Sequence, residues 1–253
     1  MPAQDYYFSR KAVPRFGKLY FLKVLHEADS EGGGRSLLGS VVQELREGLF
    51  GLGQHYPVPL HMSKPGIVHD AIERNRKHLD LAAGDRIVLS QKLAQVQQSV
   101  VIKRKETFGA GVGPFPSLPA NFGLDMDYSL MRQVTLAFGM NTQFEYIPLG
   151  YFARLYQYVD GDDRKVDRSG AIEDNNIVDS ILLAKEFHVT FESEKDFDAD
   201  FEAKLKAFSN IPGVGAKVAY ARQTKRKILA KVSGKQYYLV ALGVSDWDDF
   251  DLT

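Results

Sequence analysis

The sequence contains no cysteine, and this absence removes several classes of site at once. It excludes disulfide bonds, thiolate-bound zinc, a cysteine nucleophile and S-acylation. The absence also fits a protein that works in a reducing compartment.

Long hydrophobic runs are missing as well. No stretch approaches the roughly 18 apolar residues of a membrane-spanning helix. The N-terminus also lacks the apolar core of about 7–15 residues that marks a secretory signal peptide. We therefore expect a soluble protein that is cytoplasmic in its inactive form. The 253 residues, 44% of them hydrophobic, are enough for one large core. We expect a single domain over residues 1–245, beginning with a basic and aromatic segment (1–35) and followed by an acidic tail (246–253).

The chain has no net charge, with 32 basic and 32 acidic residues, but its charges are segregated. Acidic residues concentrate in 192–202 and basic residues in three clusters. A basic cluster is either a solvated surface or a contact for a membrane or a nucleic acid. A dedicated DNA-binding chain is usually more basic overall, so no nucleic acid partner is expected. The three clusters are Arg10, Lys11, Arg15 and Lys18; Lys103, Arg104 and Lys105; and Arg222, Lys225, Arg226 and Lys227.

The apolar spacing predicts helices and strands in mixed order. Helical spacing occurs over Leu37–Leu49, over 66–80, and from Pro148 to a stop at Asp160–Gly161. Phe197, Phe201, Leu205 and Phe208 predict an amphipathic helix packed on a sheet. Extended or alternating patterns occur near 55–60, 85–90, 96–103, 131–140, 175–193 and 214–244, and residues 19–25 suit a strand or a helix. The fold class is therefore α+β, with a twisted, mostly antiparallel sheet and surrounding helices.

No pattern indicates catalysis. The six histidines form no HExxH pair, so a metal site is not expected. The run "FGAGVGP" (108–114) lacks the Lys-Ser/Thr of a phosphate-binding loop and leads into prolines instead of a helix. No GxSxG elbow is present. We expect no catalytic residue, no cofactor and no enzyme activity.

Three stretches together resemble a known family. "NNIVDSILLAKEFHVTFES", "PGVGAKV" and "TKRKILAKVSGKQYYLVALGV" are similar to the second half of the gasdermin pore-forming domain. Upstream, "LPANFGLDMDYSLMRQVTLAFGM" resembles the paired strands of that family's first hairpin. The resemblance covers roughly residues 36–245. In size and layout the chain is most similar to the fungal gasdermin-like "regulator of cell death" proteins of allorecognition.

This resemblance implies a function and a set of residues. Gasdermin pore-forming domains bind acidic phospholipids, oligomerise, and refold two regions into long amphipathic β-hairpins that line a pore. Here those regions are about 96–140 and 177–232. The three basic clusters listed above are then the expected lipid contacts. The expected membrane-inserting residues are Phe108, Phe115, Val134, Leu136, Phe138, Phe187, Val189, Phe191, Val214 and Val218.

The expected partners are an acidic phospholipid membrane, further copies of the chain, and a divergent allelic homologue as activator. The active form would then lie at the plasma membrane. A second hypothesis keeps the same basic contacts but makes the protein a peripheral lipid-binding module that never inserts. For the trigger, the alternative to the allelic partner is removal of the acidic tail as a cleavable plug. Nucleic-acid binding by the last basic cluster would show as affinity that falls steeply with salt.

Overall fold

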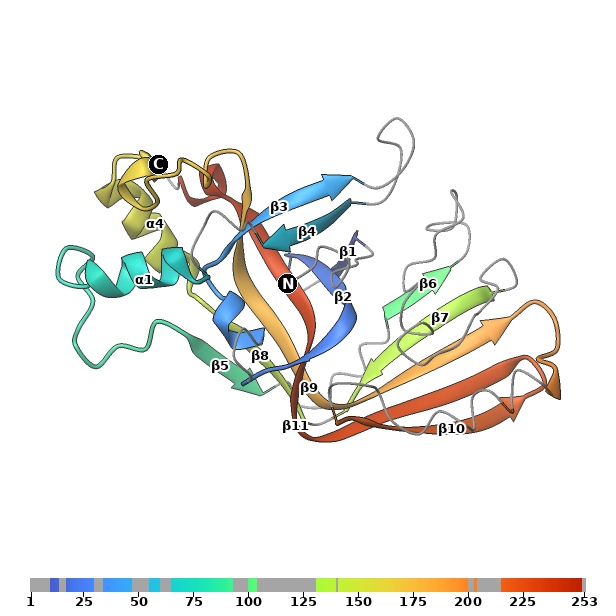
Figure 1. Cartoon of the computed structure of the whole chain (residues 1–253). Helices are drawn as coiled ribbons and strands as arrows, with labels where there is room; N and C mark the ends of the chain where they lie inside the picture. Colours follow the sequence, from blue (N-terminus) through green and yellow to red (C-terminus); the bar gives the residue numbers. More distant parts are fainter. Residues whose placement is uncertain are drawn as a thin grey trace.

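The computed structural model describes residues 10–13, 17–29, 34–46, 55–59, 65–92, 100–103, 131–139, 141–199, 203 and 215–251. Two long antiparallel strands, β9 (Asn176–Ser193) and β11 (Lys227–Asp246), run through this part of the chain (Figure 1). Shorter strands join them in an 11-stranded sheet in which every pairing is antiparallel. The shorter strands are β1 (Arg10–Val13), β2 (Gly17–Glu27), β3 (Val41–Arg46), β4 (His55–Pro59), β5 (Leu89–Lys92), β6 (Val100–Lys103), β7 (Met131–Phe138), β8 (Thr142–Tyr146) and β10 (Lys217–Thr224).

The partners of the long strands divide the sheet into two parts. Toward the C-terminal end of β11, β9 pairs with β3 and β8, and β11 pairs with β2. Toward the other end, β9 pairs with β7 and β11 pairs with β10. We call the first part the body. The second part is the arm, made of β6, β7, β10, residues 186–193 of β9 and residues 227–233 of β11.

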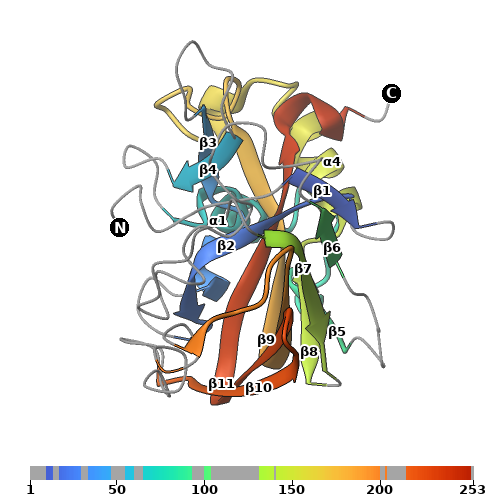
Figure 2. The ribbon, with the colours of Figure 1, turned by 90° about the vertical axis from the view of Figure 1, so that its right-hand side faces the viewer.

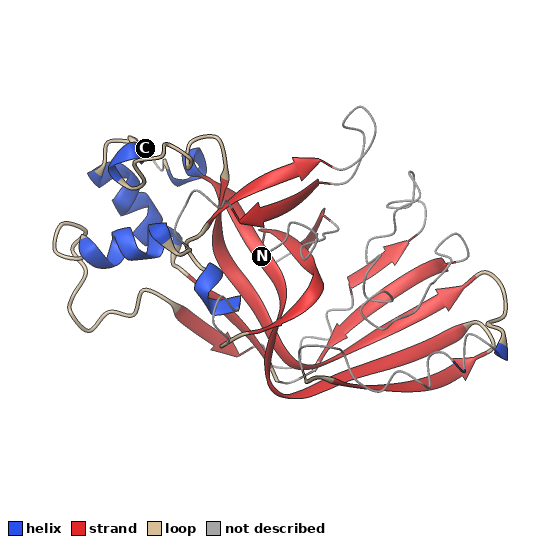
Figure 3. Ribbon diagram, viewed as in Figure 1, coloured by secondary structure: helices blue, strands red, loops and turns tan. Residues whose placement is uncertain are grey.

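A large bulge in β11 separates the arm from the body. Ser233 lies opposite Glu186 of β9, but the next paired residue of β11, Tyr238, lies opposite Ala184. Gly234, Lys235, Gln236 and Tyr237 therefore have no partner residue on β9, because β11 carries four residues between these two pairs and β9 carries only Lys185. Such insertions bend and twist a sheet. The long strands change direction at this place, and the arm extends away from the helices (Figures 1 and 3).

The body contains the main hydrophobic core. Helices α1 (Ile67–Arg74) and α4 (Leu149–Tyr158) pack beside the sheet at this end of the molecule (Figure 3). Fully burying one large apolar side chain contributes roughly 1.5–3 kcal/mol to folding. The core therefore stabilises the body strongly. Its members include Val68, Ile72, Phe152, Leu155, Val178, Ile181, Leu183, Leu239, Leu242, Trp247 and Phe250.

Helix α4 matches its sequence pattern closely. Pro148 precedes its first residue, and Asp160 and Gly161 end it with positive φ angles of 59° and 71°. Phe152, Leu155 and Val159 are buried, as their spacing predicts. Leu149 was expected on the same stripe but is half exposed, because it stands at the open first turn.

The helix expected over Leu37–Leu49 is wrong. The chain forms a 3-10 turn, η2 (Gly34–Leu37), and then strand β3. Val41 and Val42 pair with Ile177 and Asn176 of β9, and β3 also pairs with β4 along its length. The apolar residues fit both periodicities, and long-range pairing of β-branched residues selects the strand.

Other predicted elements are confirmed with different bounds. The extended segment near 55–60 is β4, and residues 19–25 lie in strand β2. The helix over 66–80 ends at Arg74, and the strand near 85–90 begins only at Leu89. The extended pattern over 214–244 forms two strands, β10 and β11, and β11 continues through Ser233 and Gly234. The amphipathic helix through Phe208 lies largely outside the described residues.

The acidic C-terminal segment belongs to the body through its aromatic residues. Turn η6 (Trp247–Phe250) buries Trp247 and Phe250, with 2% and 0% of their surfaces exposed. The Phe250 ring stacks on Phe152 with ring centroids 4.4 Å apart. The Trp247 indole nitrogen donates a hydrogen bond to the Gly161 carbonyl at 3.0 Å. The exposed residues in the described part of this segment are Asp246, Asp248, Asp249 and Asp251.

Candidate functional site

One face of the arm carries rows of apolar residues that continue from strand to strand. In the register of the sheet, Phe138, Phe187, Val232 and Val218 form one row across β7, β9, β11 and β10. A second row holds Leu136, Val189, Ala230 and Tyr220, and a third holds Val134, Phe191 and Ile228. Phe187, Val189, Phe191, Val218, Ala230 and Val232 are buried. By backbone register, seven of the ten residues predicted for membrane insertion therefore hold positions on this one face.

The opposite face of the arm is polar. Glu186, His188 and Glu192 alternate with the apolar residues of β9, and Lys231 lies opposite His188 on β11. The Lys231 ammonium is 2.7 Å from a Glu186 carboxylate oxygen, and Arg132 of β7 is 3.8 Å from Glu192. The arm is thus an amphipathic sheet, with cross-strand ion pairs on one side and apolar rows on the other.

The third basic cluster lies at the far end of the arm, away from α1 and α4 (Figure 1). Arg222, Lys225 and Arg226 are exposed, and Lys227 is partly exposed, in the turn that joins β10 to β11. We call Arg222–Lys227 the basic turn. Viewed from the end of the arm, β10 and β11 lie side by side (Figure 2).

The acidic segment that follows β9 lies against the basic turn. The Arg226 guanidinium donates to the Asp196 carboxylate at 2.9 Å, and the Phe197 amide donates to the Lys225 carbonyl at 2.8 Å. The Arg222 guanidinium also donates to the Phe197 carbonyl at 3.4 Å. Both charge clusters are visible in the sequence, but their contact is not, because it depends on the path of the chain between β9 and β10.

The other two basic clusters are only partly described. Arg10 and Lys11 lie on β1 opposite Tyr20 and Leu19 of β2, and Lys18 lies opposite Ala12. Lys103 ends β6, opposite Gln133 of β7. Their roles remain predictions. Arg15, Arg104, Lys105, Phe108, Phe115 and Val214 lie outside the described residues.

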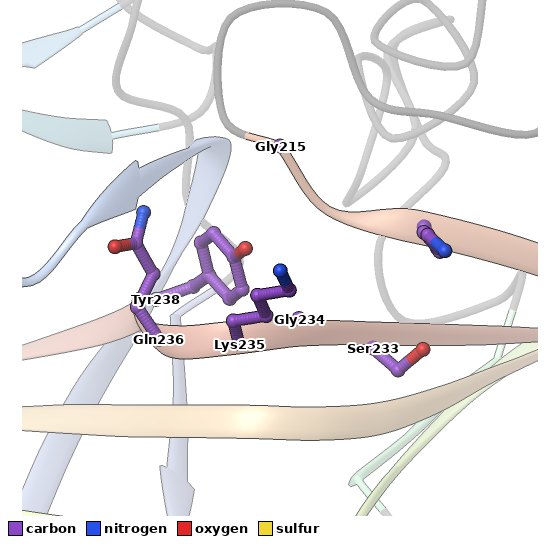
Figure 4. Close-up of a pocket in the computed structure, with 7 residues that line it drawn as sticks. Gly215, Ser233, Gly234, Lys235, Gln236 and Tyr238 are labelled. Atoms are coloured by element: carbon purple, nitrogen blue, oxygen red, sulfur yellow. The ribbon is translucent and has the colours of Figure 1, made fainter.

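An open pocket lies at the bulge between the arm and the body, with a volume of about 390 Å³. Its lining comes from β10 and from the bulged part of β11, and it includes Lys217, Ser233, Gly234, Lys235, Gln236 and Tyr238. The side chains of Lys235 and Tyr238 project from β11 toward the side on which Gly215 lies (Figure 4). A Cβ atom on Gly234 would lie 2.1 Å from the Tyr238 hydroxyl oxygen, so only glycine leaves room for this ring.

Other kinds of site find no support in the described part of the chain. There, no three histidine, aspartate or glutamate side chains gather in positions that could hold a metal ion. Among the same residues, no helix has both the length and the apolar character needed to cross a bilayer.

Comparison with known proteins finds no matching family model and no matching curated protein. Among solved structures, this chain is similar to a bacterial gasdermin from Bradyrhizobium tropiciagri. The two chains are 13% identical, the match covers 67% of this chain and 68% of that chain, and the TM-score is 0.31. This likeness is coarse and does not decide the function. It gives no information about a relation to the fungal allorecognition proteins.

Proposed function

We propose that this protein binds membranes containing acidic phospholipids, oligomerises there, and inserts β-hairpins that permeabilise the membrane. The observation that carries the proposal is the arm: an amphipathic antiparallel sheet with an exposed basic turn at its far end. The sequence resemblance to gasdermin pore-forming domains agrees with it.

The basic turn supplies the first contact in this proposal. Each cation near an anionic headgroup surface contributes about 1 kcal/mol of attraction. Four cations in Arg222–Lys227 thus contribute up to about 4 kcal/mol, which strengthens membrane binding by up to roughly three orders of magnitude. The ion pair of Arg226 with Asp196 offsets part of this attraction. Because the turn is at the end of a hairpin, it brings the tips of β10 and β11 to the bilayer first.

The apolar rows supply the second step. In the folded protein Phe187, Val189, Phe191, Val218, Ile228, Ala230 and Val232 of these rows are buried, whereas in a membrane the rows would face lipid. Paired strands suit a bilayer because their backbone groups are hydrogen-bonded to each other and not to water. β7 and β10 have 8 residues each, slightly fewer than the roughly 9–11 residues of a tilted membrane strand. Insertion therefore requires each hairpin to lengthen into its flanking segments.

The edges of the arm supply the third step. Among the described strands, β6 pairs only with β7, and β10 pairs only with β11. Within the described residues each therefore has one edge without a paired strand, and such an edge is a template for pairing with another chain. Copies gathered on a membrane would pair edge to edge. In a cell the outcome would be permeabilisation of the plasma membrane and regulated cell death.

Dye release from vesicles tests the proposal. Vesicles of phosphatidylcholine, with and without phosphatidylserine, are loaded with a self-quenching dye, and leakage and co-sedimentation are both measured. We expect leakage only with the acidic lipid. Changing Lys225, Arg226 and Lys227 to glutamate is expected to abolish binding and leakage. Lys77, Arg86 and Lys92 are exposed residues of the body, and their change to glutamate gives a control of equal charge.

The outcomes separate the alternatives. Binding to acidic vesicles without leakage would favour a peripheral lipid-binding module. Equal effects of the two triple variants would show that overall charge matters and not the basic turn. Activation by a divergent homologue remains a prediction: two alleles would leak together and each would be silent alone.

A further inference from the structure

We propose that the pocket at the bulge of β11 binds a phosphomonoester group, and that the bound group holds the arm at its present angle to the body. Lys217 and Lys235, on adjacent strands, line one small pocket where the sheet bends, and neither has an ion-pair partner among the described residues. The site is separate from the basic turn, and it does not depend on pore formation.

The charge of the pocket selects a dianion. Lys217 and Lys235 are exposed, and neither forms an ion pair with any residue that the structure describes. Two like charges in one pocket repel each other unless an anion lies between them. A phosphomonoester carries about −1.5 to −2 charges at pH 7, which balances two ammonium groups. A single carboxylate leaves one of them unbalanced.

The other groups of the pocket are hydrogen-bond donors. Ser233 contributes a hydroxyl and Gln236 an amide. Burial and the nearby Glu27 raise the pKa of the Tyr238 phenol, so it remains protonated and able to donate. The backbone N–H groups of Lys235 and Gln236 belong to the bulge and have no partner residue on β2, β9 or β10. Three phosphate oxygens can accept several of these donors together.

The size and position of the pocket would allow a bound anion to hold the arm at its angle to the body. A volume of about 390 Å³ lies in the range of roughly 300–1,000 Å³ that is usual for small-molecule sites. Lys217 belongs to the arm, whereas Lys235 lies in the bulge that leads into the body. A dianion bound by both therefore ties the first strand of the arm hairpin to the bend. Ligands that bind only the folded form stabilise it by mass action.

Calorimetric titration of the full chain with glycerol 3-phosphate, at constant ionic strength in a phosphate-free buffer, tests the site. We expect saturable binding to one site and a higher melting temperature. In the variant Lys217→Gln with Lys235→Gln, affinity should fall by at least about tenfold, which corresponds to about 1.4 kcal/mol. Binding should also weaken below about pH 6, where the phosphate gains a proton.

The matched control changes Lys77→Gln and Lys92→Gln, which removes the same charge from the body surface. Unchanged binding in this control supports the site. The absence of saturable binding in the wild type, or equal affinity in both double variants, overturns it. If the pocket double variant does not fold, Lys235→Gln alone gives the same comparison, since this exposed side chain forms no ion pair with any described residue.

The phosphate group can come from a soluble metabolite or from a lipid headgroup, and vesicles containing phosphatidic acid distinguish the two sources. Competition by glycerol 3-phosphate, together with weaker vesicle binding of the pocket variant, identifies a headgroup. If glycerol 3-phosphate binds in solution but neither effect appears, the ligand is soluble. Because the titration needs no leakage, failure of the pore proposal would leave this result standing.

Discussion

At the scale of single residues, Asp179 is a carboxyl group without a cationic partner among the described residues. It accepts hydrogen bonds from the Ser180 and Ser245 hydroxyls, each at 2.5 Å, where β9 meets β11 in the body. Burial raises the pKa of Asp179, and the two hydroxyls offset only part of that rise. The folded protein therefore favours the protonated form of this group more than the unfolded chain does.

This imbalance predicts a pH dependence of stability. In the unfolded chain the pKa of aspartate is about 3.9, and in the fold that of Asp179 is higher. As pH falls through the raised folded value toward the unfolded value, the native state gains more protons, so stability from this group increases. Asp179→Asn should remove this increase and be at least as stable as the wild type at neutral pH. Urea unfolding across this pH range measures the free energy of unfolding of both proteins. The same change with pH in the two proteins would contradict the prediction.

A second variant separates charge from hydrogen bonding at the same position. Asp179→Ala leaves the Ser180 and Ser245 hydroxyls without their acceptor, which should cost about 1–3 kcal/mol. If asparagine and alanine have the same effect, the carboxyl group does not act through these two hydrogen bonds.

The ion pair between Asp196 and Arg226 also belongs to this scale. It neutralises one cation of the basic turn in the folded protein. Asp196→Asn should therefore increase binding to acidic vesicles and speed leakage. An exposed pair contributes only about 0–1 kcal/mol, so the expected gain in affinity is about fivefold or less. Asp174→Asn, an exposed change elsewhere, is the control, and an equal gain in both variants would exclude the pair as the cause.

At the scale of elements, Arg35 joins η2 to strand β8. Its guanidinium donates to the Glu145 carboxylate at 2.8 and 2.9 Å, and it also pairs with Asp29. The hydrogen bond to Glu145 is the main reason that the pKa of Arg35 is raised. Glu145 is buried in β8, whereas Arg35 is partly exposed. This bidentate contact therefore connects η2 to strand β8 of the body.

Removing the charge of Glu145 should lower the stability of the fold. Glu145→Gln replaces charged hydrogen bonds with neutral ones, and we expect a loss of about 1.5–3 kcal/mol in the free energy of unfolding. Glu173→Gln, on the exposed loop before β9, should stay within about 0.5 kcal/mol. Chemical denaturation measures both, and a change of similar size in the two variants would show that Arg35 binds Glu145 without stabilising the fold.

At the scale of the whole molecule, the chain is neutral but its charges are separated in space. The basic turn occupies the end of the arm, and the aspartates of the C-terminal segment lie on the body. Attraction to a membrane must therefore come from local fields. Such fields decay over a screening length of about 10 Å at 0.1 M salt and about 3 Å at 1 M salt.

Salt should therefore control membrane binding. We expect co-sedimentation with phosphatidylserine vesicles at low salt and its loss at about 1 M salt, because screening removes most of the headgroup attraction. Protein that has already inserted should remain bound, since buried apolar surface is not screened. Binding that is equally strong at both salt concentrations before insertion would exclude the basic turn as the first contact.

Much of the fold could be read from local patterns. The alternation of Phe187, Val189 and Phe191 predicts a strand, because alternate side chains must reach opposite faces. The stripe of α4 and its stop at Asp160–Gly161 predict a helix and its end. The basic turn is likewise visible as a charge cluster between two alternating segments. In each case the determining interaction acts between residues only a few positions apart.

The tertiary structure decided those features that depend on contacts between residues far apart in the sequence. Val41 and Val42 suit a helix or a strand, and pairing with β9, more than a hundred positions later, selects the strand. The bulge at Gly234–Tyr237 exists only because β9 carries fewer residues opposite it, and the pocket exists only because of the bulge. The contact of Asp196 with Arg226 and the burial of Asp179 have the same origin. By itself, the sequence determined local periodicity, helix ends and charge clusters; the pairing of distant strands determined which groups meet, because registers and burial are properties of the whole sheet.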